Sequence, residues 1–594
     1  MVDFLCATRR ARRLFPASCL AATLAAIVAN APLTAGAQAQ PAATGYINYD
    51  LDDTVIHPVH ALHGMVSSES ALASDVGVEV LRKGGNAVDA AVAVGFALAV
   101  TMPNSGNIGG GGFMILHDGK TGKDTAIDFR EVAPAAATRD MYLDPNGKVI
   151  SDKSLFTQAA IGVPGTVAGL TYALEHYGTK KRAELVAPAV RLANQGFTVG
   201  ETLAGVFAAE HDHLGAWAGT RKVFFHGGKV PVTGDLLRNP DLGKSLALIG
   251  RDGAKAFYDG PIAAAIVAEA KAHGGLITAA DLKDYKVVER TPVRGSYRGY
   301  EIVSMPPPSS GGVHVVQILN ILSNFPLRDW GPNSAKTIHV MAEAEKRAYA
   351  DRSEYLGDPD FVKVPVKGLT APAYAKELAG QIDPEHATPS AQIKPGRPQP
   401  YESDQTTHYV VADGQGSVVS VTYTLNTNFG SGIVASGTGI VLNNEMDDFS
   451  AKPGVPNAYG LVGGDANAVA PRKRPLSSMS PTIVLKDGKP WLVTGSPGGA
   501  RIITTTLQVL VNSIDFGMNP AEAGSAVRTH HQWLPDELRI ERGLSPDTVA
   551  LLRGMGHKVV ERQSMGDTQT IQILPTGFYG YADQRDPNGA ARGW

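Results

Sequence analysis

The segment of residues 86–103, NAVDAAVAVGFALAVTMP, constrains the fold more than any other stretch of the chain. Its pattern predicts a helix that is apolar nearly all round and that ends at Pro103. A helix without a wide polar face must be buried between other layers. The preceding residues 68–85, SESALASDVGVEVLRKGG, predict another helix, because apolar residues recur at three- and four-residue spacing before a glycine pair.

Beyond Thr406 the chain becomes rich in strand-forming runs. THYVVAD, SVVSVTYTLN and PTIVLKDGKPWLVTGSPGG alternate or are β-branched, with turn residues between them. The run ARIITTTLQVLVNSIDFG predicts a long apolar helix. Together these patterns predict β-strands with apolar helices on their outer side. Length alone suggests about three or four domains.

Three segments before Thr406 carry polar residues at positions that predict local structure: a strand end, a helix start and a linker. TAIDFREVAP predicts a strand with Arg130 at its end, and SAKTIHVMAEAEKRAYADR predicts an amphipathic helix capped by Ser334. Residues 385–405 are rich in Pro, Gln, Ser and Thr, which predicts an exposed, flexible linker. Thr406 therefore lies between a flexible segment and a rigid strand.

The N-terminus has the pattern of a secretory signal. A basic RRARR at residues 9–13 precedes an apolar, alanine-rich stretch and the small residues of LTAGAQAQ, so cleavage after Ala37 or Ala39 fits. The apolar stretch is too short to cross a bilayer stably, and both Sec and twin-arginine export are compatible with it. Cys6 and Cys19 lie within the removed residues 1–39, so the mature protein has no thiol. We expect a periplasmic or secreted protein without a membrane anchor.

Several other functions are disfavoured by charge and spacing. A net charge of −3 and the lack of aromatic–basic interleaving give no surface for nucleic acid. The GKT at residues 119–121 lacks the glycine spacing of a phosphate loop and predicts a hairpin turn. EHDH and THHQW lack the HExxH spacing of a metal centre, and GSPGG lacks the nucleophile elbow of a Ser-His-Asp hydrolase. We expect no metal and no cofactor.

Thr406 is a candidate nucleophile if it becomes an N-terminus. A threonine hydroxyl needs an adjacent base, and a free α-amine, with an unperturbed pKa of about 7.7–8.0, is a base suited to neutral pH. Before cleavage of the Gln405–Thr406 bond that nitrogen is an amide and cannot accept the proton. A threonine at a strand start also has the simpler explanation of β-propensity.

The order of longer motifs resembles the gamma-glutamyltransferase family. The matching runs are LRKGGNAVDAAVA, NIGGGGF, DFRE, QTTHY, VTYTLNTNFGSGIV, NNEMDDFS, KRPLSSMSPTIV and TGSPGGARIITT. They cover nearly the whole mature chain, from about His57 to the C-terminus. The resemblance implies an α+β fold of the N-terminal-nucleophile hydrolase type, a four-layer αββα sandwich of two stacked antiparallel sheets flanked by helices. It also implies self-cleavage into a large subunit (residues 40–405) and a small subunit (residues 406–594) that remain one intertwined domain.

The resemblance also implies catalytic roles for four residues. Thr406 matches the nucleophile, and Thr424 matches the threonine whose hydroxyl orients it. Gly498 and Gly499 match the oxyanion hole, where the lack of a Cβ lets two backbone N–H groups approach the developing charge.

The implied substrate contacts fall at both ends of a glutamyl group. Arg130, Ser477 and Ser478 match the contacts to the α-carboxylate, Asn426, Glu445 and Asp448 match those to the α-amino group, and Tyr459 matches the gate of a lid loop. We choose Asp448 over Asp447 because alternation along a strand aims only one of them inward. Without the resemblance, this acidic run is typical of a solvated face.

The expected activity is that of an exported gamma-glutamyltransferase and glutathione hydrolase. Thr406 is expected to form a γ-glutamyl ester that passes to water, an amino acid or a peptide. One alternative is a cephalosporin acylase of the same family, whose glutaryl substrates lack the α-ammonium. A second alternative is a non-catalytic exported binding protein, which is disfavoured because Thr406 and the SPGG glycines are present.

Overall fold

The computed structural model describes residues 54–398 and 408–594. The predicted signal segment and the Gln405–Thr406 bond lie outside the described residues. Residues Ile56–Trp594 form one compact unit, so the several domains suggested by length are not found. None of the described helices is long and apolar enough to span a bilayer.

Two seven-stranded sheets form the centre of this unit, and every strand pairing within them is antiparallel. Sheet A has the order β1 (Val59–Ala61), β20 (Gly577–Ala582), β19 (Gln569–Leu574), β15 (Lys489–Gly495), β14 (Thr482–Lys486), β9 (Tyr300–Ser304) and β8 (Val293–Tyr297). Sheet B has the order β21 (Ala590–Gly593), β2 (Gly64–Ser68), β10 (Tyr409–Asp413), β11 (Val418–Thr424), β3 (Gly111–His117), β4 (Asp124–Phe129) and β7 (Val288–Arg290).

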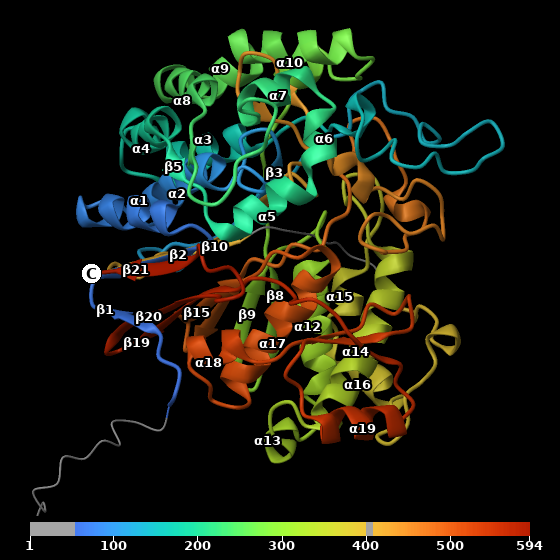
Figure 1. The fold of residues 1–594 in the computed structure, drawn as a ribbon. Helices are drawn as coiled ribbons and strands as arrows, with labels where there is room; N and C mark the ends of the chain where they lie inside the picture. The colour runs from blue at the N-terminus through green and yellow to red at the C-terminus, as the bar shows by residue number, and fades with distance from the viewer. Residues whose placement is uncertain (1–53, 399–407) are drawn as a thin grey trace, which may run out of the picture. The chain divides into compact units, whose positions relative to one another are not determined.

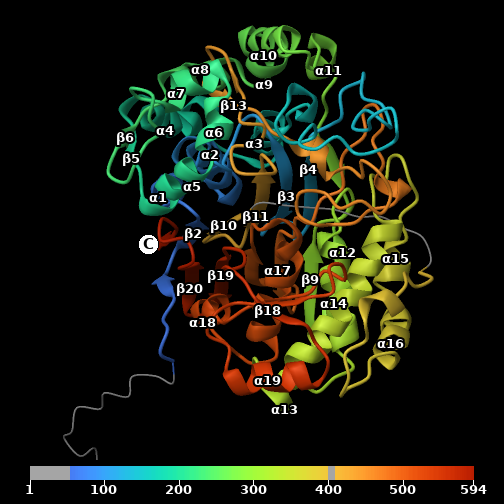
Figure 2. The same ribbon diagram turned by 45° about the vertical axis from the view of Figure 1, so that its right-hand side comes forward.

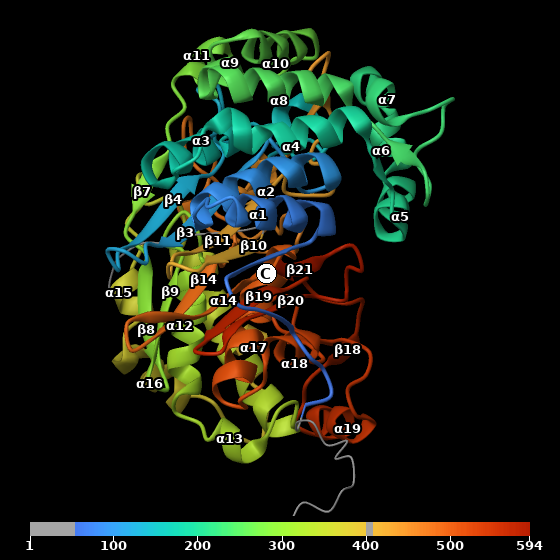
Figure 3. The ribbon, with the colours of Figure 1, turned by 90° about the vertical axis from the view of Figure 1, so that its left-hand side faces the viewer.

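Helices cover the outer face of each sheet, which gives the four layers that were predicted (Figures 1 and 3). Over sheet B lie α1 (Ala71–Arg82), α2 (Ala87–Thr101) and α3 (Thr166–Tyr177); α4 (Arg182–Gln195) packs on the far side of α2, and α8 (Pro240–Asp252) packs on α4. Over sheet A lie α12 (Gly311–Leu322), α14 (Ala335–Tyr355), α17 (Ile502–Ile514) and α18 (Pro520–Ser525), which Figure 2 shows from a second side. The αββα fold class is confirmed.

The strands are apolar on both faces because each sheet lies between two apolar layers. In β10, Val410 belongs to the core between the two sheets, whereas Val411 belongs to the core under the helices. This is the reason that β-branched residues occupy consecutive positions in several of the strands after Thr406, beside the alternating ones.

Helix α2 is buried along its whole length, as its sequence predicts. Asn86 and Asp89 form a capping box at its start. Two tyrosines of sheet B donate hydrogen bonds to its backbone, Tyr409 to the Ala91 carbonyl at 2.9 Å and Tyr423 to the Gly95 carbonyl at 3.0 Å. The first of these tyrosines lies in β10 and the second in β11, so α2 fixes the strands nearest the predicted cleavage point.

The remaining elements lie around these layers. The helices are α5 (Glu201–Ala209), α6 (His211–Gly215), α7 (Ala218–Phe224), α9 (Ala254–Tyr258), α10 (Pro261–Ala272), α11 (Ala279–Lys283), α13 (Leu327–Trp330), α15 (Val366–Leu369), α16 (Pro372–Gly380) and α19 (Pro546–Gly554). The strands are β5 (Phe197–Thr198), β6 (Leu236–Leu237), β12 (Val434–Ala435), β13 (Ile440–Val441), β16 (Thr529–His530), β17 (Leu538–Ile540) and β18 (Val559–Glu561).

The prediction of an exposed linker at residues 385–405 holds for half of its described residues, but the segment is also anchored to the rest of the molecule. Ser390 is fully buried, and its N–H donates to Asp536 at 2.8 Å. The N–H of Gly396 donates to Asp351 at 2.8 Å. Polar composition predicted the exposure but not the anchoring, because the anchoring comes from backbone N–H groups bonded to carboxylates of distant segments. The predicted Ser334 cap is confirmed, since its hydroxyl accepts from the Thr337 N–H at 3.2 Å.

Candidate functional site

A cavity of about 400 Å³ gathers most of the predicted site residues. Nine of them line it: Thr424, Asn426, Glu445, Asp448, Tyr459, Ser477, Ser478, Gly498 and Gly499. Arg130 does not line the cavity but bonds to two residues that do. Thr406 lies outside the described residues. Positions that are far apart in sequence thus converge because the two sheets stack.

Thr424 and Asn426 stand where β11 ends. The Thr424 hydroxyl accepts a hydrogen bond from the Asn426 N–H at 2.8 Å. Asn426 has a φ of 81°, a left-handed conformation that asparagine tolerates better than most residues. Its side-chain amide donates to the Asn444 carbonyl at 3.1 Å. The turn after β11 therefore holds both residues at the cavity wall.

A buried guanidinium organises the acidic side of the cavity. Arg130 follows β4 and is fully buried. It donates to Glu445 and, at 2.6 Å, to Asp448, while Glu131 lies at 3.6 Å. In the described chain the predicted α-carboxylate ligand thus pairs with the predicted ammonium ligands.

The charges of this cluster are strongly coupled. Burial raises the pKa of Glu445 well above its usual range; Arg130 opposes this shift, and the carboxyls of Glu131 and Asp448 add to it. Burial likewise raises the pKa of Glu131 to about 7, against the attraction of Arg130. For Arg130 itself, burial favours the neutral form, but the three carboxyls outweigh it and raise the pKa. The cluster can therefore hold a proton near neutral pH.

The two adjacent aspartates face different partners. Asp448 lines the cavity, whereas Asp447 accepts from the Ser154 hydroxyl at 2.7 Å and from the Ala458 N–H at 3.0 Å. Asp448 was chosen over Asp447 by assuming the alternation of a strand. This assumption is wrong, because Glu445–Asp448 is a 3₁₀ turn and not a strand. The separation comes from the turn, which carries successive side chains around an axis.

The paired serines are held by a helix that the sequence did not connect with the site. Ser477 and Ser478 are buried, and Arg352 of α14 donates to the Ser477 carbonyl and to the Ser478 hydroxyl, both at 3.4 Å. Arg352 also donates to the Ser310 hydroxyl at 2.9 Å. Sequence reasoning missed Arg352 because it reads as a charged residue on an exposed helix face.

The SPGG loop connects β15 to the helical segment that begins α17. Gly498 and Gly499 have φ values of 130° and 58°, which favour glycine. A Cβ at Gly499 would also overlap the ring of Tyr459. Within the described chain, neither glycine N–H donates a hydrogen bond to another backbone group. The loop can therefore present two N–H groups to an anion at the start of a helix.

Tyr459 closes one side of the cavity. Its hydroxyl donates to the Asn426 carbonyl, and its own carbonyl accepts from Gln532 at 3.3 Å. Asn457, two residues earlier, donates to Asp448 at 3.2 Å and accepts from the Tyr459 N–H at 3.1 Å. The predicted lid segment is thus bonded to the acidic cluster and to the turn after β11.

Three further charged residues that the sequence analysis did not assign to the site also line the cavity, Glu69, Glu210 and Arg501. Glu69 follows β2 and is buried, which raises its pKa well above the usual range, with Asp586 and Asp583 adding to the shift. Arg501 lies two residues after Gly499, and this closeness to the SPGG loop was the only signal for it in the sequence. In residues 54–398 and 408–594 no group of three or more His, Cys, Asp or Glu side chains is placed to hold a metal ion.

Two stacked antiparallel sheets between helical layers, with the cavity at the ends of β11 and β15, define an N-terminal-nucleophile hydrolase. The sequence pattern of the Gamma-glutamyltranspeptidase family matches residues 73–593. The chain belongs to the gamma-glutamyltranspeptidase family.

Individual relatives agree with this assignment. The chain is 58% identical to the glutathione hydrolase proenzyme of Escherichia coli (strain K12), over 92% of this chain and 95% of that protein. It is 49% identical to the glutathione hydrolase proenzyme of Pseudomonas sp. (strain A14), over 90% of this chain and 95% of that protein. Among solved structures, a cephalosporin acylase from Bacillus halodurans matches with a TM-score of 0.81 at 28% identity, covering 94% of this chain and 99% of that one.

Proposed function

We propose that the protein is an exported gamma-glutamyltransferase and glutathione hydrolase that activates itself by cleavage before Thr406. One observation carries the proposal: a single cavity brings the carboxylates of Glu445 and Asp448 together with the paired serines and the SPGG loop. These groups match the ammonium, carboxylate and reacting carbonyl of a γ-glutamyl compound.

The strand register supports Thr406 as the partner of Thr424. Tyr409 pairs with Val421 and Val410 with Ser420 in the antiparallel ladder of β10 and β11. If the ladder continues in the processed enzyme, position 406 stands opposite Thr424. The Thr424 hydroxyl is then placed to orient the nucleophile, as the family resemblance implies.

In the proposed reaction, the Thr406 hydroxyl oxygen attacks the γ-carbonyl carbon and its proton passes to the free α-amine of the same residue. The carbonyl oxygen becomes an oxyanion that the N–H groups of Gly498 and Gly499 stabilise. As the carbon–nitrogen bond breaks, the amine returns the proton to the leaving nitrogen. Water or an acceptor amine then attacks the Thr406 ester in the reverse sequence.

Charge at both ends of the glutamyl group fixes the reactive carbon. Asp448 and Glu445 receive the α-ammonium, assisted by Asn426. Arg130, Ser477 and Ser478 receive the α-carboxylate, which requires Arg130 to exchange part of its present pairing with the acids. Tyr459 limits the entry of water and so favours acceptor amines.

A comparison of two donors tests this function against the acylase alternative. The glutaryl substrates of an acylase lack the α-ammonium and would leave Asp448 and Glu445 without a cation. We expect rapid hydrolysis of γ-glutamyl-p-nitroanilide and at least about a hundredfold slower hydrolysis of glutaryl-p-nitroanilide, because a buried charged partner is lost. A preference for the glutaryl compound would instead favour the acylase.

A further inference from the structure

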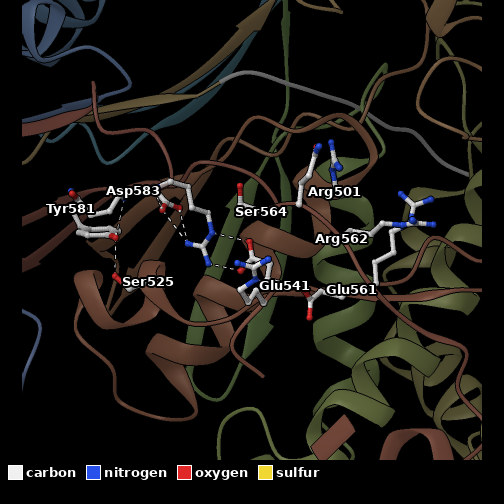
Figure 4. A pocket seen from close by; sticks show the side chains of 13 residues that line it. Arg501, Ser525, Glu541, Glu561, Arg562, Ser564, Tyr581 and Asp583 are labelled. Atoms are coloured by element: carbon white, nitrogen blue, oxygen red, sulfur yellow. Dashed lines mark hydrogen bonds and ion pairs between the residues drawn. The ribbon is translucent and has the colours of Figure 1, made fainter. Parts of the chain in front are cut away.

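A second and larger cavity, of about 910 Å³, adjoins the site and shares Arg501 with it. Figure 4 shows Arg501 and Arg562 toward one end, and Asp583, Ser525 and Tyr581 toward the other. Five arginines and three carboxylates line it. Its lining therefore carries an excess of positive charge next to the predicted oxyanion loop.

The carboxylates of this cavity already have cationic partners. Glu541 accepts from Arg585 at 2.8 Å, and Asp583 accepts from Arg585 at 3.1 Å and from the deeper Arg528. Glu561 lies 3.7 Å from the exposed Arg542. In the part of the chain that the structure describes, none of these three carboxylates forms an ion pair with Arg501 or Arg539.

Within residues 54–398 and 408–594, Arg501 and Arg539 are the two arginines of this cavity that have no carboxylate closer than 4.0 Å. Among the residues that the structure describes, no carboxylate forms an ion pair with Arg501, whose Nε donates only to the Gly498 carbonyl, at 3.3 Å. Arg539 of β17 approaches Glu537 at 4.0 Å, but Glu537 is bound more closely by Lys558 at 3.0 Å and Arg562 at 3.2 Å. Burial, and then the positive charge of Arg539, lower the pKa of Arg501. Two like charges thus line the same cavity.

We propose that Arg501 and Arg539 form a carboxylate-binding subsite for the C-terminal carboxylate of the peptide on the far side of the scissile bond. This peptide is the leaving dipeptide of glutathione or a peptide acceptor. The inference rests on the proposed function and specifies which donors and acceptors the site prefers.

Arg501 lies beside the predicted oxyanion loop and lines both cavities, since its Nε donates to the Gly498 carbonyl at 3.3 Å. The two residues of a leaving dipeptide span about 7 Å when extended, so their carboxylate ends beyond that loop. A planar guanidinium pair suits a carboxylate because each can donate two parallel hydrogen bonds. Both arginines stand on ordered elements, Arg501 at the start of α17 and Arg539 within β17.

The test compares glutathione with its C-terminal glycine amide, which differ only in the terminal carboxylate. For the unaltered protein we expect kcat/KM to be about tenfold higher with glutathione, the size expected for a charged hydrogen-bonded partner. Arg539→Gln should bring this ratio close to one, chiefly through the KM for glutathione. Arg539→Lys should keep part of the preference.

Two controls separate this subsite from the rest of the enzyme. γ-Glutamyl-p-nitroanilide has no carboxylate on its leaving group, so its kcat/KM should stay within about twofold in Arg539→Gln, which also shows that the variant is folded. Arg542→Gln removes an arginine of the same cavity whose side chain is 93% exposed, and it should leave the ratio unchanged.

An equal rate for the acid and the amide in the unaltered protein would overturn the subsite, as would an unchanged ratio in Arg539→Gln. Either result leaves the proposed function intact if γ-glutamyl-p-nitroanilide is still hydrolysed. If the unaltered protein hydrolysed none of the three compounds (glutathione, its glycine amide and γ-glutamyl-p-nitroanilide), the proposed function itself would be overturned.

Discussion

At the scale of single residues, local geometry separates chemical roles that the sequence leaves together. Asp447 and Asp448 are identical neighbours, yet one binds Ser154 and the lid backbone and the other binds Arg130 and lines the cavity. The sequence could place an acidic pair near the site. It could not give the 3₁₀ turn that separates them, because four residues carry too little periodicity.

The two aspartates give a matched pair of variants. Asp448 is bonded to the buried Arg130 and is proposed to receive the α-ammonium of the substrate. Asp448→Asn removes this negative charge, so we expect the KM for γ-glutamyl-p-nitroanilide to rise about a hundredfold, with a smaller effect on kcat. Asp447→Asn makes the same chemical change one residue earlier and should affect stability more than KM. Steady-state kinetics of both variants decide this, and equal KM values would contradict the role of Asp448.

At the scale of elements, α14 and α2 mark what sequence patterns can and cannot predict. The uniform apolar composition of α2 predicted its complete burial. The sequence predicted α14 as an amphipathic helix, but Glu343, Lys346 and Arg347 of its polar residues are buried as ion pairs. These charges are buried because the chain after α14 covers them. Lys346, for example, donates to the Thr388 carbonyl, in the segment predicted as an exposed, flexible linker.

The buried Glu343 gives a prediction on stability and pH. Burial raises its pKa, but Lys346 and Arg347 outweigh burial and lower the pKa to about 2. The unfolded chain, with the ordinary value of 4.5, binds more protons between these limits, so the stabilisation is present above pH 4.5 and is lost as pH falls toward 2. We expect Glu343→Gln to lower the free energy of unfolding by about 3–5 kcal/mol at pH 7, because two buried cations lose their partner.

Denaturant unfolding between pH 7 and pH 3 measures this effect. The difference between Glu343→Gln and the unaltered protein should shrink on acidification. Glu354→Gln, on the exposed side of the same helix, should change the free energy of unfolding by less than about 0.5 kcal/mol at every pH. A difference for Glu343→Gln that does not vary with pH would contradict the ion-pair account.

At the scale of the whole molecule, both sheets combine strands from before and after the predicted cleavage point. In sheet B, β10 pairs with β2 and β11 with β3; in sheet A, β14 pairs with β9. Family resemblance gave the layered fold correctly, and length alone gave too many domains. Which strands pair across the cleavage point could not be derived from local patterns, because register depends on contacts between distant segments.

This interleaving predicts that the two subunits remain together after processing. Separating them would break the central pairings of both sheets and expose the core between them. We expect both polypeptides to elute in one peak on native gel filtration and to melt in one transition. Elution of a folded small subunit by itself would contradict the intertwined domain.

The most direct measurement is N-terminal sequencing of the polypeptides in purified, active protein, alongside a Thr406→Ala variant. The account predicts a smaller polypeptide that begins TTHY in the unaltered protein, and a single inactive chain in the variant. Full activity toward glutathione from an uncleaved chain, or from Thr406→Ala, would contradict it.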